Sequence, residues 1–335
     1  MKPFEHLNAR TVEEACALLK QRQGRARINA GGTDLLSVLK DRILSDDPDL
    51  LINIKTIPGL DAVRADRNSL SIGPLTTLAT VAASPVVRER YTVLAEAARA
   101  VATPQIRNMG TIGGNLCQDV RCWYYRYPSS VGGPIRCLRK GSGPCLAVLG
   151  DNRYHAILEG KRCFAVCPSD TAVALAALDG EIEVASPAGG RRIAVTDFFA
   201  PLGNALRQDE MVTGIKVPGI SEPSKQTFLK FTLRTPVDFA LVSVAFVAAF
   251  EGDGYRNVRI ALGAVAPGPV RARKAELLLK GRRIDCALAR EAAELAVGDA
   301  KPMSMNAYKV EIAKALVQRA ILASGSLLPP PDPIS

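Results

Sequence analysis

The stretch Asn29-Ala30-Gly31-Gly32-Thr33-Asp34-Leu35-Leu36 decides the fold. It follows a short run with strand character at residues 25–29 and precedes a helical pattern over residues 35–43. The sequence therefore predicts a strand, a glycine turn and a helix. Adjacent glycines let a backbone approach a ligand closely, and their exposed N–H groups can bind phosphate oxygens. Thr33 adds a hydroxyl donor to this turn.

A second glycine turn, Gly110-Thr111-Ile112-Gly113-Gly114-Asn115, follows about eighty residues later. Either turn alone is more typical of a tight turn without a ligand. The two together indicate a site that grips one diphosphate from two sides. Neither turn reads G-x-G-x-x-G or carries a Walker sequence, so an ordinary Rossmann or P-loop site is not supported.

The rest of the chain alternates strands and helices without a regular βαβ order, which predicts an α+β architecture. Strands are expected at residues 50–54, 69–72, 181–185, 191–194, 211–218, 226–233, 240–251 and 258–265. Helices are expected at residues 11–23, 76–82, 86–101, 170–178, 271–279, 287–297 and 306–323. A linker is expected near residues 220–224, and the proline-rich residues 326–335 are expected to form an extended tail.

Composition excludes several classes of protein. No stretch has the roughly 18 apolar residues of a membrane span, and the N-terminus shows no secretory signal. We therefore expect a cytoplasmic chain without a membrane partner. The net charge is +10, but the Lys and Arg residues are scattered and aromatic residues make up only 5 %. These features argue against a nucleic-acid partner and fit a basic surface that docks on acidic partner subunits.

Six of the eight cysteines fall between residues 117 and 167, in a segment of about fifty residues without clear periodicity. Structural disulfides are rare in the cytosol, and a long irregular loop in a compact domain is usually functional. We interpret residues 117–167 as a cysteine-rich insertion. A structural zinc site would favour C-x₂₋₄-C pairs, which Cys122, Cys137 and Cys145 do not form. An iron–sulfur cluster, a zinc ion and no metal all remain possible interpretations.

The motifs at 29–36 and 110–115 together resemble the two FAD-binding signatures of the xanthine dehydrogenase and carbon monoxide dehydrogenase flavoprotein family. Pro168-Ser169-Asp170 resembles the family's aspartate segment, and residues 228–230 and 238–245 resemble the start of its C-terminal domain. The resemblance implies a two-subdomain FAD-binding domain of the vanillyl-alcohol-oxidase type at residues 1–219, divided into 1–57 and 58–219. A smaller α/β C-terminal domain would occupy residues 225–325.

The same resemblance implies roles for individual residues. The turn at 29–36 would hold the pyrophosphate, and the second motif would contact FAD from the other subdomain. Asp170 would bind the adenosine or ribityl part, and Thr213 and Lys230 would lie near the isoalloxazine ring, although Lys230 also fits an exposed strand lysine. The implied FAD-binding set is Asn29, Ala30, Gly31, Gly32, Thr33, Asp34, Leu35, Leu36, Thr103, Gly110, Thr111, Gly113, Gly114, Asn115, Asp170, Thr213 and Lys230.

The insertion resembles that of the 4-hydroxybenzoyl-CoA reductase β subunit, which binds a [4Fe–4S] cluster. The resemblance implies Cys122, Cys137, Cys145 and Cys163 as ligands, with Cys117 or Cys167 as alternatives for the fourth. His155 is expected to be a surface group rather than a ligand. Eight Lys or Arg residues surround the cysteines, and a positive environment stabilises a negatively charged cluster.

The resemblance implies an electron-transfer subunit that works with a molybdenum-cofactor large subunit and a [2Fe–2S] small subunit. Ferredoxin or NAD would be the external electron carrier. No catalytic residue is expected, because His6 and His155 lie outside the flavin motifs. The alternatives are a stand-alone flavin dehydrogenase or oxidase, a xanthine or aldehyde dehydrogenase-type subunit whose insertion binds no cluster, and a non-enzymatic scaffold.

Overall fold

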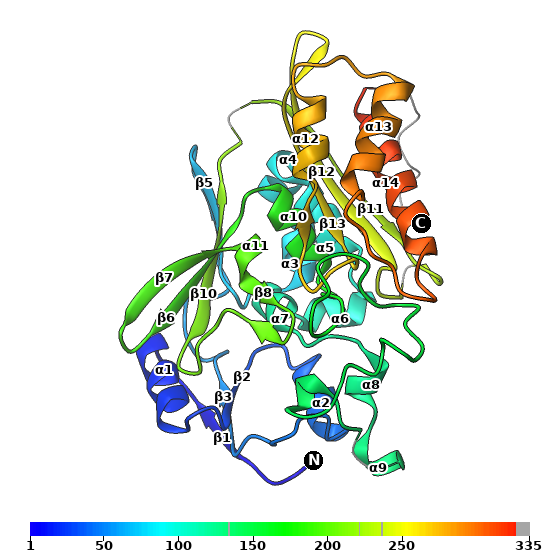
Figure 1. The fold of residues 1–335 in the computed structure, drawn as a ribbon. Helices are drawn as coiled ribbons and strands as arrows, with labels where there is room; N and C mark the ends of the chain where they lie inside the picture. The colour runs from blue at the N-terminus through cyan, green and yellow to red at the C-terminus, as the bar shows by residue number, and fades with distance from the viewer. Residues whose placement is uncertain (133–134, 221, 236, 326–335) are drawn as a thin grey trace.

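The computed structural model describes residues 1–132, 135–220, 222–235 and 237–325. Three sheets follow one another along the chain, each with its own helices (Figure 1). The architecture is α+β, as the sequence predicts. The expected tail at residues 326–335 lies outside the described residues.

The first sheet is parallel and has three strands in the order β1 (Glu5–Asn8), β3 (Leu50–Asn53) and β2 (Ala26–Asn29). Two helices accompany it, α1 (Val12–Gln21) and α2 (Leu35–Lys40). Thr11 caps α1, because its hydroxyl accepts a hydrogen bond from the Glu14 N–H. This small layer lies at the N-terminal end of the molecule in Figure 1, and its strand β2 leads into the first glycine turn.

The second sheet is antiparallel, and its central strand β10 comes from far along the chain. Its order is β4 (Val63–Ala65), β5 (Ser69–Ile72), β10 (Met211–Pro218), β6 (Glu181–Ser186) and β7 (Gly189–Ala194). Its helices are α3 (Leu78–Ala83), α4 (Pro85–Arg90), α5 (Thr92–Arg99), α6 (Pro104–Met109), α7 (Ile112–Cys117), α10 (Asp170–Ala177) and α11 (Val195–Phe198). A small hairpin of β8 (Phe199–Ala200) and β9 (Gly203–Asn204) follows α11.

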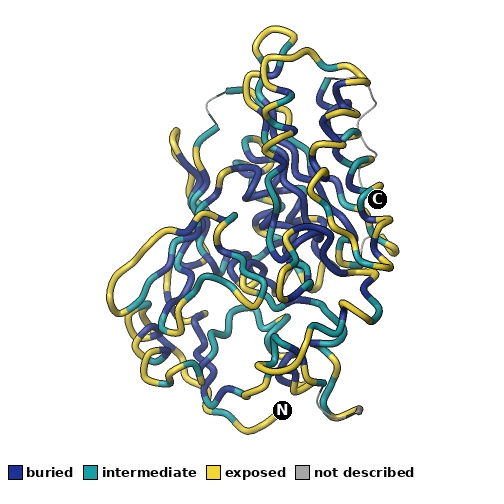
Figure 2. Tube along the Cα trace, in the orientation of Figure 1, coloured by how far each residue is buried: buried dark blue, intermediate teal, exposed yellow. Residues whose placement is uncertain are grey.

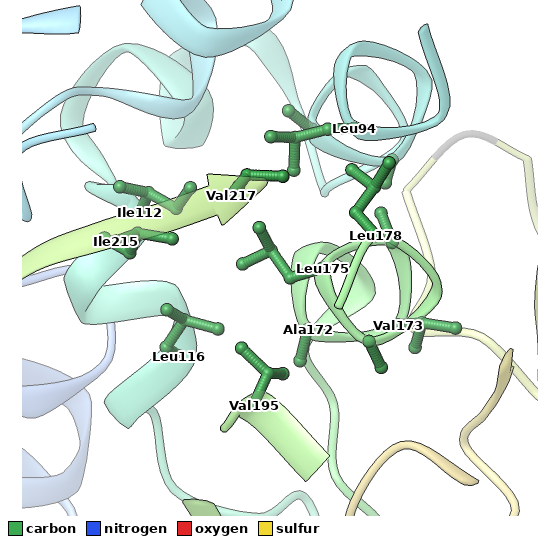
Figure 3. Close-up of a cluster of buried hydrophobic side chains, with 14 of the residues drawn as sticks. Leu94, Ile112, Leu116, Ala172, Val173, Leu175, Leu178, Val195, Ile215 and Val217 are labelled. Atoms are coloured by element: carbon green, nitrogen blue, oxygen red, sulfur yellow. The ribbon is translucent and has the colours of Figure 1, made fainter. Parts of the chain in front are cut away.

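The largest apolar core joins this sheet to its helices. Leu175 of α10 packs among Leu94, Ile215 and Val217, as Figure 3 shows. Every residue of α10 is buried, which explains why its sequence is apolar on all sides. This core fixes where α10 begins, and Asp170 is its first residue.

The third sheet forms the C-terminal part of the chain. Its antiparallel strands are β11 (Ser224–Phe231), β12 (Val242–Glu251), β13 (Gly254–Gly263) and β14 (Val270–Arg271). Helices α12 (Arg273–Leu279), α13 (Cys286–Ala296) and α14 (Tyr308–Ser324) pack on one side of it, while α5 and α10 contact it from the other. The sheet is consequently buried along most of β12 (Figure 2).

The described residues of the cysteine-rich insertion form only short helical turns, α8 (Trp123–Arg126), α9 (Ser129–Gly132) and the 3₁₀ helix η1 (Leu138–Lys140). Its second half is hydrogen-bonded to the C-terminal part of the chain. The Ile157 N–H donates to the Val265 carbonyl at 2.8 Å, and the Cys167 N–H donates to the Ala266 carbonyl at 3.0 Å. The insertion thus packs against the third sheet instead of extending into solvent.

One predicted helix is wrong. Residues 86–101 form two helices, α4 and α5, separated at Tyr91, whose φ of −130° and ψ of 47° are not helical. The Tyr91 side chain is fully buried, and its hydroxyl donates to the Pro218 carbonyl at 3.3 Å. Tertiary packing of this ring therefore overrides the helical periodicity of the segment.

Candidate functional site

The first glycine turn presents unpaired backbone donors. Within the described residues, the N–H groups of Gly31, Gly32, Thr33, Asp34 and Leu35 donate to no protein atom. Gly32 has a φ of +72°, a conformation that side chains disfavour. Asn29 Oδ1 is buried without a partner beside this turn. A run of free N–H groups next to an orphaned polar atom is the arrangement expected of an anion-binding loop.

The two glycine motifs are in direct backbone contact. A Cβ atom added to Gly31 would lie 2.1 Å from the carbonyl oxygen of Met109, the residue just before the second motif. No side chain can be accommodated at that distance, so glycine is required at position 31. The close approach brings the two motifs together on one cleft.

The second motif differs from the expected cradle, because its amides are already used. The N–H groups of Ile112 and Gly113 donate to the carbonyls of Thr76 and Pro74, both at 2.9 Å. The Gly114 N–H donates to Thr111 Oγ1 at 3.1 Å. The prediction that these amides are free is therefore wrong. The residues instead form α7, with Thr111 as its N-cap.

A cleft of about 550 Å³ lies between the motifs, within the range usual for ligand sites. It is lined by Ala30 to Leu35 from the first motif and by Thr111, Gly113 and Gly114 from the second. Residues Glu210 to Val212 at the start of β10 also line it. The cleft thus collects residues from three distant parts of the chain.

Other predicted residues lie outside the cleft lining, namely Asn29, Leu36, Thr103, Gly110, Asn115, Thr213 and Lys230. Thr103 caps α6, and the Thr213 hydroxyl donates to the Glu183 carbonyl at 3.3 Å. Asn115 Oδ1 accepts hydrogen bonds from Ser169 and Thr171 at 2.6 and 2.7 Å. Asn115 therefore orients the segment that leads into α10.

A second cavity of about 570 Å³ adjoins the cleft, and both are lined by Cys167 and Pro168. Asp170 lies in its wall and pairs with Lys230, with 2.7 Å between Oδ2 and Nζ. Both side chains are less than 8 % exposed, so the alternative of an exposed strand lysine is wrong. Burial raises the pKa of Asp170, and the Lys230 charge partly offsets this effect.

Asp34 has a structural role that the sequence did not reveal. Its carboxylate accepts the Asp119 N–H at 2.7 Å and lies 2.7 and 3.0 Å from the guanidinium groups of Arg126 and Arg121. All three partners belong to the insertion, more than 80 residues away. Asp34 therefore fastens the insertion to the first glycine turn. The only signal in the sequence was the excess of arginine over acidic residues in the insertion.

Four cysteines line a third, small cavity inside the insertion: Cys122, Cys137, Cys145 and Cys163. Tyr125 and Arg139 also line it. Cys117 and Cys167 line the glycine-motif cleft instead. The four cysteines come from separate short turns, so tertiary structure brings together residues spread over about forty positions.

The cysteines are not arranged around a single ion. Among the described residues, no group of three or more His, Cys, Asp or Glu side chains lies close enough to hold one metal ion. A zinc site needs donors about 2.3 Å from one point, and the described side chains do not form such a group. The pKa of the Cys122 thiol is raised to about 11, mainly by burial, with smaller contributions from the neighbouring Cys163 and Cys145.

His155 is buried, with 2 % of its surface exposed, so the expectation of a surface group is wrong. Its Nε2 atom lies 3.2 Å from Cys122 Sγ. Burial lowers the pKa of His155 to about 4, helped by the nearby charge of Lys309. The imidazole is consequently neutral near pH 7.

None of the described helices combines the length and the apolar character needed to cross a bilayer. This finding applies to the described part of the chain alone.

Two family profiles match the chain. The profile described as FAD binding domain in molybdopterin dehydrogenase matches residues 2–220. The profile described as CO dehydrogenase flavoprotein C-terminal domain matches residues 227–324.

Similar proteins and structures agree with these matches. The aldehyde oxidoreductase FAD-binding subunit PaoB of Escherichia coli is 35 % identical over 94 % of this chain and 96 % of its own length. The glyceraldehyde dehydrogenase medium chain of Sulfolobus acidocaldarius is 27 % identical over 95 % and 96 %. A chain of carbon monoxide dehydrogenase from Hydrogenophaga pseudoflava superposes with a TM-score of 0.78 at 27 % identity, covering 97 % of this chain and 98 % of that one.

The fold and the cleft define a flavin-binding subunit of an oxidoreductase. The chain belongs to the family of FAD-binding subunits of molybdopterin dehydrogenases. The finer resemblance to 4-hydroxybenzoyl-CoA reductase finds no support in these relatives, whose names refer to other substrates.

Proposed function

We propose that this chain binds FAD along the glycine-motif cleft and the adjoining cavity. The free N–H groups of residues 31–35 carry this proposal, because they can donate to the diphosphate oxygens. Thr111, Gly113 and Gly114 form the facing wall of the cleft. Asp170 lines the second cavity, where the flavin ring would be placed, and pairs with the buried Lys230. A buried cation near a flavin stabilises its anionic reduced form.

The chain serves as the electron-transfer subunit of a molybdenum hydroxylase-type enzyme, and an aldehyde is the favoured substrate class. The support comes from relatives named as aldehyde oxidoreductase and glyceraldehyde dehydrogenase subunits. Substrate chemistry would occur on a molybdenum-cofactor large subunit, with a [2Fe–2S] small subunit between the two. The bound flavin would exchange electrons in pairs with one partner and singly with another.

The domain limits follow the same proposal. Residues 1–219 would form the FAD-binding domain, with subdomains at 1–57 and 58–219, and residues 225–325 the C-terminal domain. Ferredoxin or NAD remains the proposed external carrier. A stand-alone flavin enzyme is the rival, and co-purification of the two other subunits with the native chain would distinguish the two possibilities.

The proposal predicts that Gly31→Ala weakens FAD binding. The new methyl group would meet the Met109 carbonyl at 2.1 Å, so the turn must move and its N–H groups must turn away from the diphosphate. We expect the FAD dissociation constant to rise at least tenfold, about 1.4 kcal/mol, as measured by flavin fluorescence quenching. Gly298→Ala is the matched control, because the nearest atom to its added Cβ lies 3.5 Å away. Unchanged affinity in Gly31→Ala would contradict the proposed site.

We further propose that Cys122, Cys137, Cys145 and Cys163 hold a [4Fe–4S] cluster. The support is the single cavity that they line, together with Arg139 in the same lining. When bound, the cluster would accept and release one electron at a time. The alternative is a xanthine or aldehyde dehydrogenase-type subunit whose insertion binds no cluster. The relatives named as aldehyde oxidoreductase and glyceraldehyde dehydrogenase subunits favour this alternative over the reductase-like interpretation.

The cluster proposal predicts iron and acid-labile sulfide in equal amounts in the anaerobically purified chain. Cys137→Ser should remove most of both, because a buried ligand is lost. Cys286→Ser, an exposed cysteine of the C-terminal part, should remove neither. Cys167→Ser tests the alternative fourth ligand and should also retain the iron. Wild-type protein that contains flavin but no iron would support the cluster-free alternative.

A further inference from the structure

His155 lies at the boundary between two cavities. It lines the cavity proposed for the flavin ring, together with Cys122 and Trp123. Cys122 also lines the four-cysteine cavity, so this residue borders both spaces. The 3.2 Å contact between His155 Nε2 and Cys122 Sγ is therefore made at the wall that the two cavities share.

The backbone of His155 is held on several sides. Its carbonyl accepts hydrogen bonds from Lys309 Nζ at 3.0 Å and from Asn306 Nδ2 at 3.1 Å. Its N–H donates to the Asn152 carbonyl at 3.0 Å. These contacts come from α14, from the segment before it and from the insertion itself. The position of the ring thus does not depend on the bond to sulfur.

The ring itself is packed by aromatic neighbours. Trp123 lies with its centroid 6.0 Å from that of His155, and Tyr124 lies at 6.1 Å. The other ring nitrogen, Nδ1, is buried and has no partner within the described residues. A neutral imidazole carries one N–H proton. Among the residues that the structure describes, Cys122 Sγ is the only partner of either ring nitrogen, so a hydrogen-bonded ring proton lies on Nε2.

A cysteine that binds metal is a thiolate and has no proton to donate. His155 must then be the donor of this contact, and a hydrogen bond to an ionised sulfur is stronger than one between neutral groups. Hydrogen bonds to cluster sulfurs help set the reduction potential. The reduced form carries more negative charge, so a donor stabilises it and raises the potential.

We propose that His155 is a positioning residue that donates Nε2–H to the Cys122 thiolate and raises the reduction potential of the cluster on the side facing the flavin. This inference rests on the proposed cluster and on its ligand Cys122. The hydrogen bonds from Asn306 and Lys309 to the His155 carbonyl hold the imidazole donor in place beside Cys122.

The test is a redox titration of the full chain, followed by electron paramagnetic resonance, with iron and flavin measured on every sample. His155→Phe keeps an aromatic ring but removes the donor. We expect the potential to fall by about 59 mV, a tenfold change for a one-electron couple. His155→Gln keeps a donor and should recover part of the shift. His6→Phe, at the only other histidine, should leave the potential unchanged.

A second measurement uses the unmodified chain. With two histidines in the sequence, ¹⁵N-histidine labelling should give one weak nitrogen coupling to the reduced cluster, from His155. A strong coupling, with iron lost in both His155 variants, would make His155 a ligand and overturn the inference. Iron-loaded His155→Phe with an unchanged potential would overturn it too. Wild-type protein without iron would instead refute the proposed cluster, and this inference with it.

Discussion

Lys230 and Asp170 form a buried ion pair. The two side chains are 6 % and 7 % exposed, and Lys230 Nζ also donates to the Ala100 carbonyl at 2.8 Å. Lys230→Met removes one charge and leaves the other buried. Breaking such a pair costs about 3–5 kcal/mol. We expect a loss of that order in the free energy of unfolding, measured by denaturant titration of the flavin-free chain.

The double variant Lys230→Met with Asp170→Asn distinguishes the contribution of buried charge from that of packing around the two side chains. With no charge left buried, most of the stability should return. Lys225→Met is the control, because Lys225 is an exposed lysine of the same strand, β11. A double variant as unstable as Lys230→Met would mean that packing around the lysine stem, rather than charge, provides the stability.

Helix α5 and strand β11 are joined by a half-buried glutamate, Glu96. Glu96 Oε2 accepts the Phe228 N–H at 2.8 Å, and burial raises the pKa of Glu96, partly opposed by this bond and by Arg99. The folded state therefore binds the proton more tightly than the unfolded state does. The tighter proton binding by Glu96 stabilises the folded state fully at pH values below the pKa of Glu in the unfolded state, near 4.3. This stabilisation is lost as the pH rises through the pKa of Glu96 in the folded state.

Glu96→Gln stays uncharged at every pH. Its stability relative to wild type should therefore increase as the pH rises from about 4 to about 7. Denaturant unfolding across this range measures the difference. Glu89→Gln, at an exposed glutamate of α4, should show no such trend. A Glu96→Gln difference that stays constant with pH would contradict the inferred burial effect.

The elements with strong local signals could be predicted from the sequence. The strand at residues 69–72 lies as β5 where the alternation of polar and apolar residues indicates it, and the first glycine turn lies between β2 and α2. The break at Tyr91 could not be predicted, because it depends on the distant Pro218 carbonyl. Local periodicity carries no information about such contacts.

The sequence indicated which motifs form the site but not which contacts their residues make. Glycine spacing indicated the cleft, yet the second motif uses its amides in contacts with Thr76 and Pro74, which precede it by more than thirty residues. The role of Asp34 depends on Arg121 and Arg126 in an insertion without periodicity. The burial of His155 depends on α14. In each case the deciding partner is far away in the sequence.

At the scale of the whole molecule, the insertion is a bridge between the first glycine turn and the C-terminal sheet with its helices. Asp34 holds one end through Arg121 and Arg126. At the other end, Asn306 donates to the carbonyls of His155 and Ala156 at 3.1 and 3.2 Å. The three cavities adjoin one another because the bridge is fixed at both ends. Releasing one end should loosen the bridge without unfolding the sheets.

Asn306→Ala tests this arrangement. Asn306 is fully buried, and its loss leaves the Ala156 carbonyl and the Met303 N–H without their side-chain partner, while the His155 carbonyl keeps its hydrogen bond from Lys309. Each buried donor or acceptor left without a partner costs about 1–3 kcal/mol of stability. Local opening of residues 152–158 should therefore become more frequent. Hydrogen exchange followed by mass spectrometry should show faster exchange there and unchanged exchange in β12. Asn257→Ala, on the exposed part of β13, is the control. Equal acceleration in β12 would show that the bridge and the sheet open as one unit, and would contradict a separately anchored insertion.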